Sequence, residues 1–125
     1  MTTQRKLNPL DRAMLAAESR EMMIHVGSLL LFSPPPEGAR DFHRDLMEEL
    51  KRDQKVFPPG NLKLRSPDWL GSPRQAWIED TSFDLDYHVR RSALPTPGDE
   101  RELGILVSRL HSNPIDFHRP PWEAH

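Results

Sequence analysis

The sequence predicts a mixed α/β (α+β) fold, in which helices and short strands follow one another along a single domain. Three observations predict this class. Three stretches carry apolar residues at helical spacing, several short stretches are continuously apolar or alternate with period two, and proline-rich segments separate them. The chain has 125 residues, which suits one domain, and 13 of them are proline, where an average chain of this length has about 6.

The first helix is predicted to start after Asn8, because asparagine followed by Pro9 is typical of an N-cap and a first helical residue. Asp11 then lies in the first turn, where the helix dipole favours a carboxylate. Apolar residues recur on one face of this stretch, at Leu10, Met14 and Ala17. We therefore expect a helix to about Glu21.

The next stretch, IHVGSLLLF at residues 24–32, predicts a strand that is buried on both faces. It is apolar at both sets of alternate positions and carries little charge, which is typical of such strands. Gly27 within it indicates a bulge or the close approach of another backbone. The proline run that follows ends the strand.

An amphipathic surface helix is predicted next, because Phe42, Leu46 and Leu50 recur every four residues among charged side chains. Residues 53–75 are poorly patterned, with one short strand expected at Leu62–Leu64. The sequence AWIED, at residues 76–80, predicts another strand.

Strict alternation in FDLDYHVR, residues 83–90, predicts a half-exposed strand. A third helix is expected after Asp99, which forms a capping box with Glu102. Its apolar stripe comprises Leu103, Leu106, Val107 and Leu110. The pair Asn113-Pro114 should end it. The last residues, PPWEAH, look like the start of a further buried strand.

The composition excludes several classes of protein. A net charge of −2 and a pI near 6.3 provide no basic footprint for nucleic acid. The absence of cysteine excludes a disulfide framework, a thiol nucleophile and thiolate metal sites. The N-terminus lacks the apolar core of a signal peptide, and residues 24–32 span about half a bilayer. A cytoplasmic protein is therefore expected.

The pattern His-x4-Asp at His111 and Asp116 matches the spacing of glycerolipid acyltransferases, in which aspartate orients a histidine base. The alternative is a histidine that complements the dipole at a helix C-terminus, and this interpretation is favoured. His43 is predicted to be a surface residue. His118 and His125 lie near a chain end, without recognisable catalytic neighbours.

Asp84, Asp86 and His88 would share one face of the predicted strand, so an oxygen-and-nitrogen metal site is conceivable there. Polar residues at period two are also what the solvated face of any strand contains, and we favour that interpretation. No metal site and no cofactor are predicted. Nucleophile-elbow, phosphate-loop and zinc-protease motifs are absent from the sequence, so local motifs alone do not predict a function.

Two long stretches together resemble one family, the bacterial wax ester synthase/diacylglycerol acyltransferase group. NPLDRAMLAAESREMMIHVGSLLLFSPPPEG, residues 8–38, resembles its N-terminal opening, a Pro-Leu-Asp helix followed by a Met-His-Val-Gly strand. WIEDTSFDLDYHVRRSALPTPGDERELGILVSRLHSNPIDFHRPPWEAH, residues 77–125, resembles the segment that leads to the active-site motif. The resemblance covers nearly the whole chain and is weakest across residues 53–75.

The resemblance implies a partial fold of the chloramphenicol-acetyltransferase and condensation-domain type, with residues 1–125 as the N-terminal segment of one half. It implies acyl transfer from acyl-CoA, the co-substrate, to a fatty alcohol or diacylglycerol. The family's His-His-x-x-x-Asp-Gly motif supplies the base that takes the acceptor's hydroxyl proton. That motif is absent from these residues, so no catalytic residue is assigned.

Four positions match the family's motifs and are expected to be substrate-binding, pocket-lining or structural: Asp11, His25, Gly27 and Trp122. Two departures from the family pattern lie close to the last of these. Pro-Leu-Trp reads Pro120-Pro121-Trp122 here, which replaces a residue able to donate a ladder hydrogen bond with one that cannot. The family's Leu-Asp-Arg reads Ile115-Asp116-Phe117.

Two hypotheses follow. In the first, the chain is a lipid O-acyltransferase segment that contributes scaffold but no base and is inactive alone. In the second, it is a non-enzymatic module whose uncovered apolar faces bind lipid, a protein partner or another copy. Either hypothesis is compatible with peripheral association at a membrane or lipid inclusion.

Overall fold

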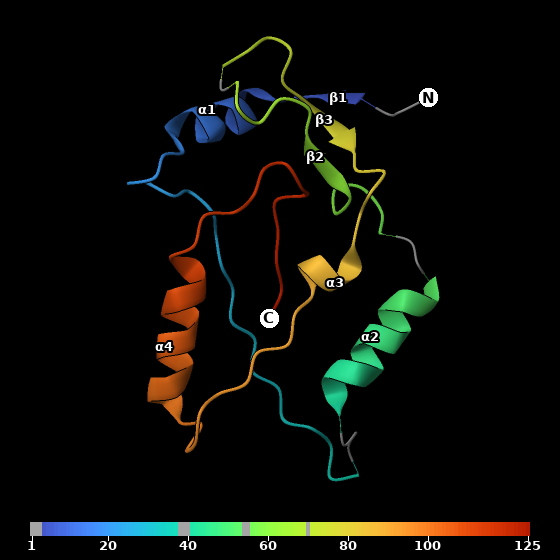
Figure 1. The fold of residues 1–125 in the computed structure, drawn as a ribbon, viewed down its shortest axis with the longest axis vertical. Helices are drawn as coiled ribbons and strands as arrows, with labels where there is room; N and C mark the ends of the chain where they lie inside the picture. The colour runs from blue at the N-terminus through green and yellow to red at the C-terminus, as the bar shows by residue number, and fades with distance from the viewer. Residues whose placement is uncertain (1–3, 38–40, 54–55, 70) are drawn as a thin grey trace.

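The computed structural model describes residues 4–37, 41–53, 56–69 and 71–125 (Figure 1). These residues confirm the mixed class. Their elements are β1 (Gln4–Lys6), α1 (Pro9–Ala17), α2 (Phe42–Asp53), β2 (Leu62–Leu64), β3 (Ala76–Glu79), α3 (Leu85–His88) and α4 (Glu100–His111). None of the described helices is both long enough and apolar enough to cross a bilayer.

The sheet has three strands in the order β1-β3-β2, and both pairings are antiparallel. The predicted strands at Leu62–Leu64 and in AWIED are confirmed as β2 and β3. Strand β1 was not predicted, because its residues, Gln-Arg-Lys, are exposed and polar. This segment is a strand because it pairs with β3, where Arg5 lies opposite Trp77. Its residue pattern alone does not predict a strand.

A small core lies between α1 and the sheet at one end of the molecule (Figure 1). Leu7, Leu15 and Leu64 are its buried members, and Trp77 and Phe117 pack against them. Toward the other end, α2 and α4 lie at the two sides of the view, with α3 between them.

Helix α1 begins as predicted and ends earlier than predicted. The Asn8 side chain accepts a hydrogen bond from the Asp11 amide, and Asp11 reaches back to the Asn8 amide, so that the two form a capping box. Glu18 leaves the helical conformation, and its carboxylate accepts a 2.6 Å hydrogen bond from the Ile24 amide. The predicted extension to Glu21 is therefore wrong, because the chain turns at Ser19–Met22, where the Ser19 amide donates to the Met22 carbonyl.

The two remaining long helices are confirmed. The α2 helix spans Phe42–Asp53, and α4 spans Glu100–His111 with Asp99 as its N-cap, whose side chain accepts from the Glu102 amide. No residue of α4 is fully buried, but Leu103, Leu106 and Leu110 of its apolar stripe are half-buried, whereas Ile105 lies off the stripe and is 52% exposed. The helix is therefore amphipathic, and its apolar side is partly covered.

The predicted buried strand at residues 24–32 is wrong. The segment carries no strand assignment, and its second half is exposed, with Leu30 at 70% and Phe32 at 78%. A strand needs a neighbouring strand for its hydrogen bonds, and among the described residues no strand pairs with residues 24–32. The segment therefore has the apolar pattern of a buried strand without the hydrogen-bonded partner.

The predicted strand at residues 83–90 is also wrong, since Leu85–His88 form the short helix α3. The Asp84 side chain caps that helix by accepting a hydrogen bond from the Asp86 amide, and this local bond competes successfully with an extended conformation. The predicted strand at PPWEAH is reduced to one isolated parallel bridge between Val89 and Ala124.

We expect Asp80→Ala to destabilise the chain by about 1–3 kcal/mol, because it leaves a half-buried ammonium without its partner. The Asp80 side chain is 4% exposed and accepts hydrogen bonds from Lys63 Nζ at 2.9 Å and from the Ser82 amide. Urea unfolding at pH 7 measures the loss. Asp86→Ala is the control, because Asp86 pairs with Lys51 at 2.8 Å but is 65% exposed, so its removal should change stability by less than about 0.5 kcal/mol.

The ion pair between Asp80 and Lys63 should also make the stability of the chain depend on pH in the acid range. Burial raises the pKa of Asp80, but hydrogen bonds from Lys63 and Ser82 and the charges of Lys63 and Arg119 outweigh it, so this pKa lies below the ordinary value of 3.8. The stabilisation is thus complete above pH 3.8 and is lost as the pH falls through the lower folded pKa. Asp80→Ala should flatten the pH dependence of unfolding in this window, and an unchanged slope would contradict the assignment.

Candidate functional site

The C-terminal segment docks against α3 through an aromatic cluster centred on His88. This imidazole is fully buried at 0% exposure. Its ring centroid lies 4.5 Å from that of Trp122 and 4.8 Å from that of Phe83, whose plane is nearly parallel to it at 4°. Trp122 and Phe83 in turn lie 6.2 Å apart. The three rings exclude water from the junction between residues 83–88 and the chain's last residues.

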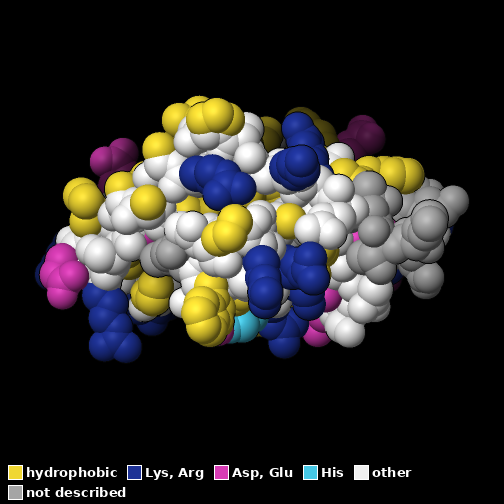
Figure 2. Space-filling model, turned by 90° about the horizontal axis from the view of Figure 1, so that it is seen from above, with side chains coloured by type: hydrophobic (Ala, Val, Ile, Leu, Met, Phe, Trp, Pro, Cys, Tyr) yellow, Lys and Arg dark blue, Asp and Glu magenta, His cyan; other side chains and the backbone are white. Residues whose placement is uncertain are grey.

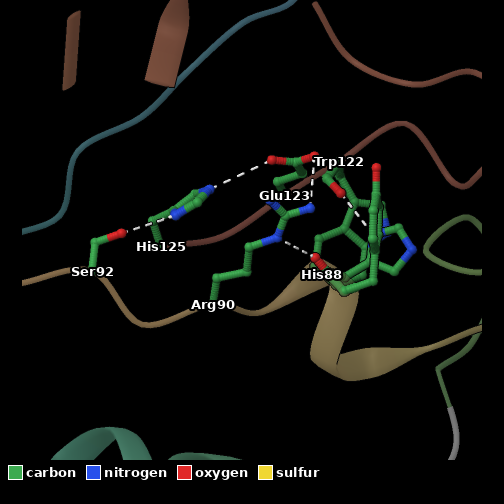
Figure 3. Close-up of polar contacts among 7 residues, drawn as sticks. His88, Arg90, Ser92, Trp122, Glu123 and His125 are labelled. Atoms are coloured by element: carbon green, nitrogen blue, oxygen red, sulfur yellow. Dashed lines mark hydrogen bonds and ion pairs between the residues drawn. The ribbon is translucent and has the colours of Figure 1, made fainter. Parts of the chain in front are cut away.

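The polar contacts of His88 define its role. Its Nδ1 lies 2.7 Å from the Trp122 carbonyl oxygen (Figure 3). A carbonyl can only accept, so Nδ1 carries the proton and donates it. The other ring nitrogen, Nε2, is buried and has no hydrogen-bond partner among the described residues. This arrangement fixes the backbone at Trp122 and offers no route for a substrate to reach the ring.

Two backbone hydrogen bonds join Ala124 to the segment that follows α3. The Ala124 amide donates to the His88 carbonyl at 2.8 Å, and the Arg90 amide donates to the Ala124 carbonyl at 2.9 Å. Figure 3 shows the side chains that flank this bridge, with the Arg90 guanidinium 3.4 Å from Glu123 and the Ser92 hydroxyl 3.1 Å from His125 Nδ1. The segment at residues 122–124 is therefore the best anchored part of the C-terminal region.

Trp122 also reaches a third segment, because its indole Nε1 donates a 2.6 Å hydrogen bond to the Gly60 carbonyl. It thus joins the loop before β2 to α3, and its ring contacts protein atoms on several sides. A role for Trp122 in binding substrate remains a prediction.

Asp11 connects α1 to the sheet. Besides the capping box, its Oδ2 accepts a 3.0 Å hydrogen bond from Trp77 Nε1. Both residues line a cavity of about 290 Å³, whose other lining residues are Arg5, Asn8, Pro59, Leu62 and Pro121. The predicted pocket-lining residue Asp11 therefore does face a cavity, one that is largely apolar and carries one cation. A role for Asp11 in binding substrate remains a prediction.

A larger and more open cavity, of about 370 Å³, lies between the loop before β2 and the end of β3. Its carboxylates are already engaged, since Glu79 accepts from the Asn61 amide nitrogen and Asp80 accepts from Lys63. Among the described residues no group of three or more histidine and carboxylate side chains is placed to hold a metal ion. The cavity therefore combines the aromatic rings of Phe57 and Phe83 with carboxylates that are already paired.

His25 and Gly27 lie beside the C-terminal end of α4. His25 Nε2 donates to the His111 carbonyl at 2.9 Å, and the two imidazoles meet edge to face with centroids 4.6 Å apart. A Cβ at Gly27 would lie 3.2 Å from His111 Nδ1, so glycine permits this close approach. The prediction of a bulge or of another backbone beside Gly27 is wrong, because the segment is not a strand and the neighbouring atoms belong to the His111 side chain. A substrate role for either residue remains a prediction.

The His-x4-Asp pair does not assemble as an acyltransferase dyad. His111 contacts His25, while the Asp116 carboxylate accepts from the His118 amide at 2.8 Å and lies 3.0 Å from His118 Nδ1. His118 Nε2 lies 3.2 Å from Asp68, so this exposed imidazole bridges two carboxylates. His43, predicted to be a surface residue, is half-buried on α2.

The conceivable metal site at Asp84, Asp86 and His88 does not form, because Leu85–His88 are the helix α3 and not a strand. Asp84 caps α3, Asp86 pairs with Lys51 at 2.8 Å, and His88 is buried. Sequence reasoning missed His88, because alternation placed it on a solvated face. The one usable signal was Asp84-x-Asp86, a pattern that favours a capped turn.

We expect His88→Phe, which keeps an aromatic ring, to destabilise the chain by about 1–2 kcal/mol through loss of the hydrogen bond to Trp122. His88→Ala should cost about 3–4 kcal/mol, because it also opens a cavity in the ring cluster. Amide hydrogen exchange at Ala124 should accelerate at least tenfold in both variants. Identical exchange in the wild type and the two variants would show that His88 does not anchor residues 122–124.

The pKa of His118 should lie above its ordinary value of 6.5, because the hydrogen bonds that the imidazole donates to Asp68 and then to Asp116, together with the charges of these carboxylates, raise it. The Asp68 contact is thus complete below pH 6.5 and weakens as the pH rises through the folded pKa. An NMR titration of the imidazole protons measures this, and both Asp68→Asn and Asp116→Asn should lower the midpoint. A wild-type midpoint at or below 6.5 would refute the assignment.

Known proteins of one family resemble this chain in both sequence and fold. Residues 7–125 match the model of the wax ester synthase/diacylglycerol acyltransferase catalytic domain. A Mycobacterium tuberculosis protein that carries the name diacylglycerol O-acyltransferase is 53% identical over 123 residues, 98% of this chain and 24% of that protein. The O-acyltransferase WSD of Acinetobacter baylyi is 39% identical over 119 residues, 94% of this chain and 24% of that protein.

A solved wax ester synthase/diacylglycerol acyltransferase from Marinobacter aquaeolei superposes with a TM-score of 0.81 at 42% identity. That match covers 94% of this chain and 29% of the solved one. The chain thus spans about a quarter of the length of these curated relatives, 24% in both cases. Because the family model matches nearly all of its residues and the fold agrees, the chain belongs to the wax ester synthase/diacylglycerol acyltransferase family.

Proposed function

We propose that this chain is the N-terminal portion of an acyl-CoA-dependent O-acyltransferase that forms wax esters or triacylglycerol. The observation that carries the proposal is the match of residues 7–125 to the catalytic-domain model, together with the TM-score of 0.81. The substrates would be acyl-CoA and a fatty alcohol or diacylglycerol. The named activities of the relatives support this choice of substrates.

The reaction requires a base that these residues do not supply. A base removes the acceptor's hydroxyl proton, the oxygen attacks the thioester carbonyl, the carbon–sulfur bond breaks, and CoA leaves as a thiol after taking up a proton. The His-His-x-x-x-Asp-Gly motif that serves as base in the family is absent from the 125 residues. Of the histidines present, His25 and His88 bond backbone carbonyls and His118 bridges two carboxylates.

The chain's proposed contribution is therefore architectural. The ring cluster around His88 and the bridge at Ala124 hold residues 122–124, which by resemblance lead toward the catalytic loop. Asp11 and Trp122 tie separate segments together, and Asp11 lines a largely apolar cavity. His25 anchors the start of residues 24–32 to the end of α4, and Gly27 leaves room for the His111 ring beside it.

A second candidate function is binding without catalysis, favoured by the extent of exposed apolar surface. Val26 is 88% exposed and Leu31 is 77% exposed, and Leu10 on α1 is 67% exposed. Figure 2, which views the molecule from the end that carries α1 and the sheet, shows hydrophobic side chains interspersed with lysine and arginine. Surfaces of this kind suit a lipid inclusion, a membrane periphery or a protein partner.

We expect the purified chain to release no more CoA from palmitoyl-CoA and hexadecanol than a heat-denatured sample does, because it lacks the base. A thiol reagent follows free CoA, and the full-length Marinobacter enzyme is the positive control. Turnover by the isolated chain would contradict the proposal. If that turnover were lost in His111→Ala and retained in His118→Ala, the glycerolipid-acyltransferase interpretation would take its place.

A further inference from the structure

The three tryptophans of the chain are placed very differently. Trp77 and Trp122 are half-buried, and each indole donates a hydrogen bond to a protein acceptor. Trp69 is 71% exposed, and among the described residues its indole Nε1 has no hydrogen-bond partner. A side chain of this size that projects into solvent, with its N–H unbonded to protein, is uncommon in a folded domain.

The turn that joins β2 to β3 fixes the backbone at Trp69. The Trp69 amide donates to the Ser66 carbonyl at 3.3 Å, and the Trp69 carbonyl accepts from the Ser72 amide at 2.9 Å. At the base of the turn, the Arg65 amide donates to the Ala76 carbonyl at 2.9 Å. Because this backbone is already ordered, contact between the indole and a partner would not require the turn to become ordered first.

Three cations surround the base of this turn. Arg65 and Arg74 lie at its two ends, and Lys6 lies opposite Ala76 where β1 pairs with β3. Arg65 lies opposite Ala76 on the β2 side, so the Lys6 and Arg65 side chains share one face of the sheet. All three cations are exposed, and none forms an ion pair with a described side chain.

The one carboxylate of the turn is already engaged. Asp68 precedes Trp69, and its Oδ2 lies 3.2 Å from His118 Nε2. The surface around Trp69 therefore carries an excess of positive charge. Figure 2, which looks onto this end of the molecule, shows lysine and arginine side chains gathered with hydrophobic side chains among them.

An anionic phospholipid surface suits both the indole and the cations. Tryptophan is enriched where a membrane meets water, because its apolar ring enters the lipid while its N–H stays among the headgroups. Each lysine or arginine close to an anionic lipid surface strengthens binding about fivefold. A protein partner would need further contacts around the indole that exclude water. The cations that surround Trp69 suit lipid phosphates better than such a ring of contacts.

We propose that the β2–β3 turn is an interfacial anchor for an anionic phospholipid surface, in which Trp69 inserts among the headgroups while the three cations contact the lipid phosphates. The cations are Lys6, Arg65 and Arg74. This inference deepens the second candidate function, binding without catalysis, because it names the residues that bind and the lipid that they select. It rests on that candidate function and does not depend on acyl transfer.

Sedimentation with phosphatidylglycerol vesicles tests the anchor, and phosphatidylcholine vesicles provide the comparison without net charge. We expect the chain to bind phosphatidylglycerol more tightly by about tenfold or more, because the cations contribute only there. Trp69→Ser should weaken that binding by about tenfold, through loss of the inserted ring. Replacing Arg65 and Arg74 together by Gln should weaken it about 25-fold, the product of two fivefold losses. The Trp69→Ser variant should unfold in urea like the wild type, because the side chain that it removes is exposed.

Phe42→Ser is the matched control for the indole, because Phe42 is an aromatic residue that is 66% exposed on α2, far from the turn along the chain. Arg101→Gln on α4 is the control for charge, because Arg101 is exposed and likewise forms no ion pair with a described side chain. Both control variants should bind phosphatidylglycerol like the wild type.

Absence of binding to either vesicle, equal binding to both, or equal binding of Trp69→Ser and the wild type would overturn the anchor. So would a shift of Trp69 fluorescence that follows the concentration of the chain without vesicles, since this would identify a second copy as the occupant. Vesicle binding that every variant retains would support lipid binding as a candidate function while overturning this anchor. Acyl transfer is judged separately, because CoA release is measured without vesicles.

Discussion

The hydrogen bond from buried His88 to the Trp122 carbonyl organises much of this structure. It holds the C-terminal residues on α3, and the indole of Trp122 then reaches the loop before β2. Three segments that lie far apart in the sequence thereby share one dry junction. Because a buried carbonyl or imidazole without a partner is costly, this arrangement specifies one docking position for residues 122–124.

Apolar side chains are buried at one end of the molecule and exposed elsewhere. Leu7, Leu15 and Leu64 form a small core between α1 and the sheet. By contrast, no residue of α4 is fully buried, and residues 24–32 expose both apolar faces. Among the residues that the structure describes, one ring nitrogen of His25 and one of His88 are buried without a hydrogen-bond partner. Both histidines lie in the part of the chain that matches the solved enzyme.

The histidines show why residue type and spacing are weak guides to chemistry. His111 and Asp116 stand at an acyltransferase spacing, yet each contacts a different histidine. His88 appeared to belong to a solvated face and is the most buried side chain of the cluster. In each case the hydrogen-bond partner comes from a residue that spacing did not single out, and the partner decides the role.

The sequence alone determined whatever depends on neighbouring residues. The Asn8–Asp11 capping box, the Asp99 cap, the faces of α2 and α4, and the strands β2 and β3 were all readable, because caps and periodicity act within a few residues. The family motifs were readable for the same reason. Only the tertiary structure decided that Gln4–Lys6 is a strand, that residues 24–32 are not one, and that His88 is buried. Pairing and burial depend on which distant segments meet, and a linear pattern does not contain that information.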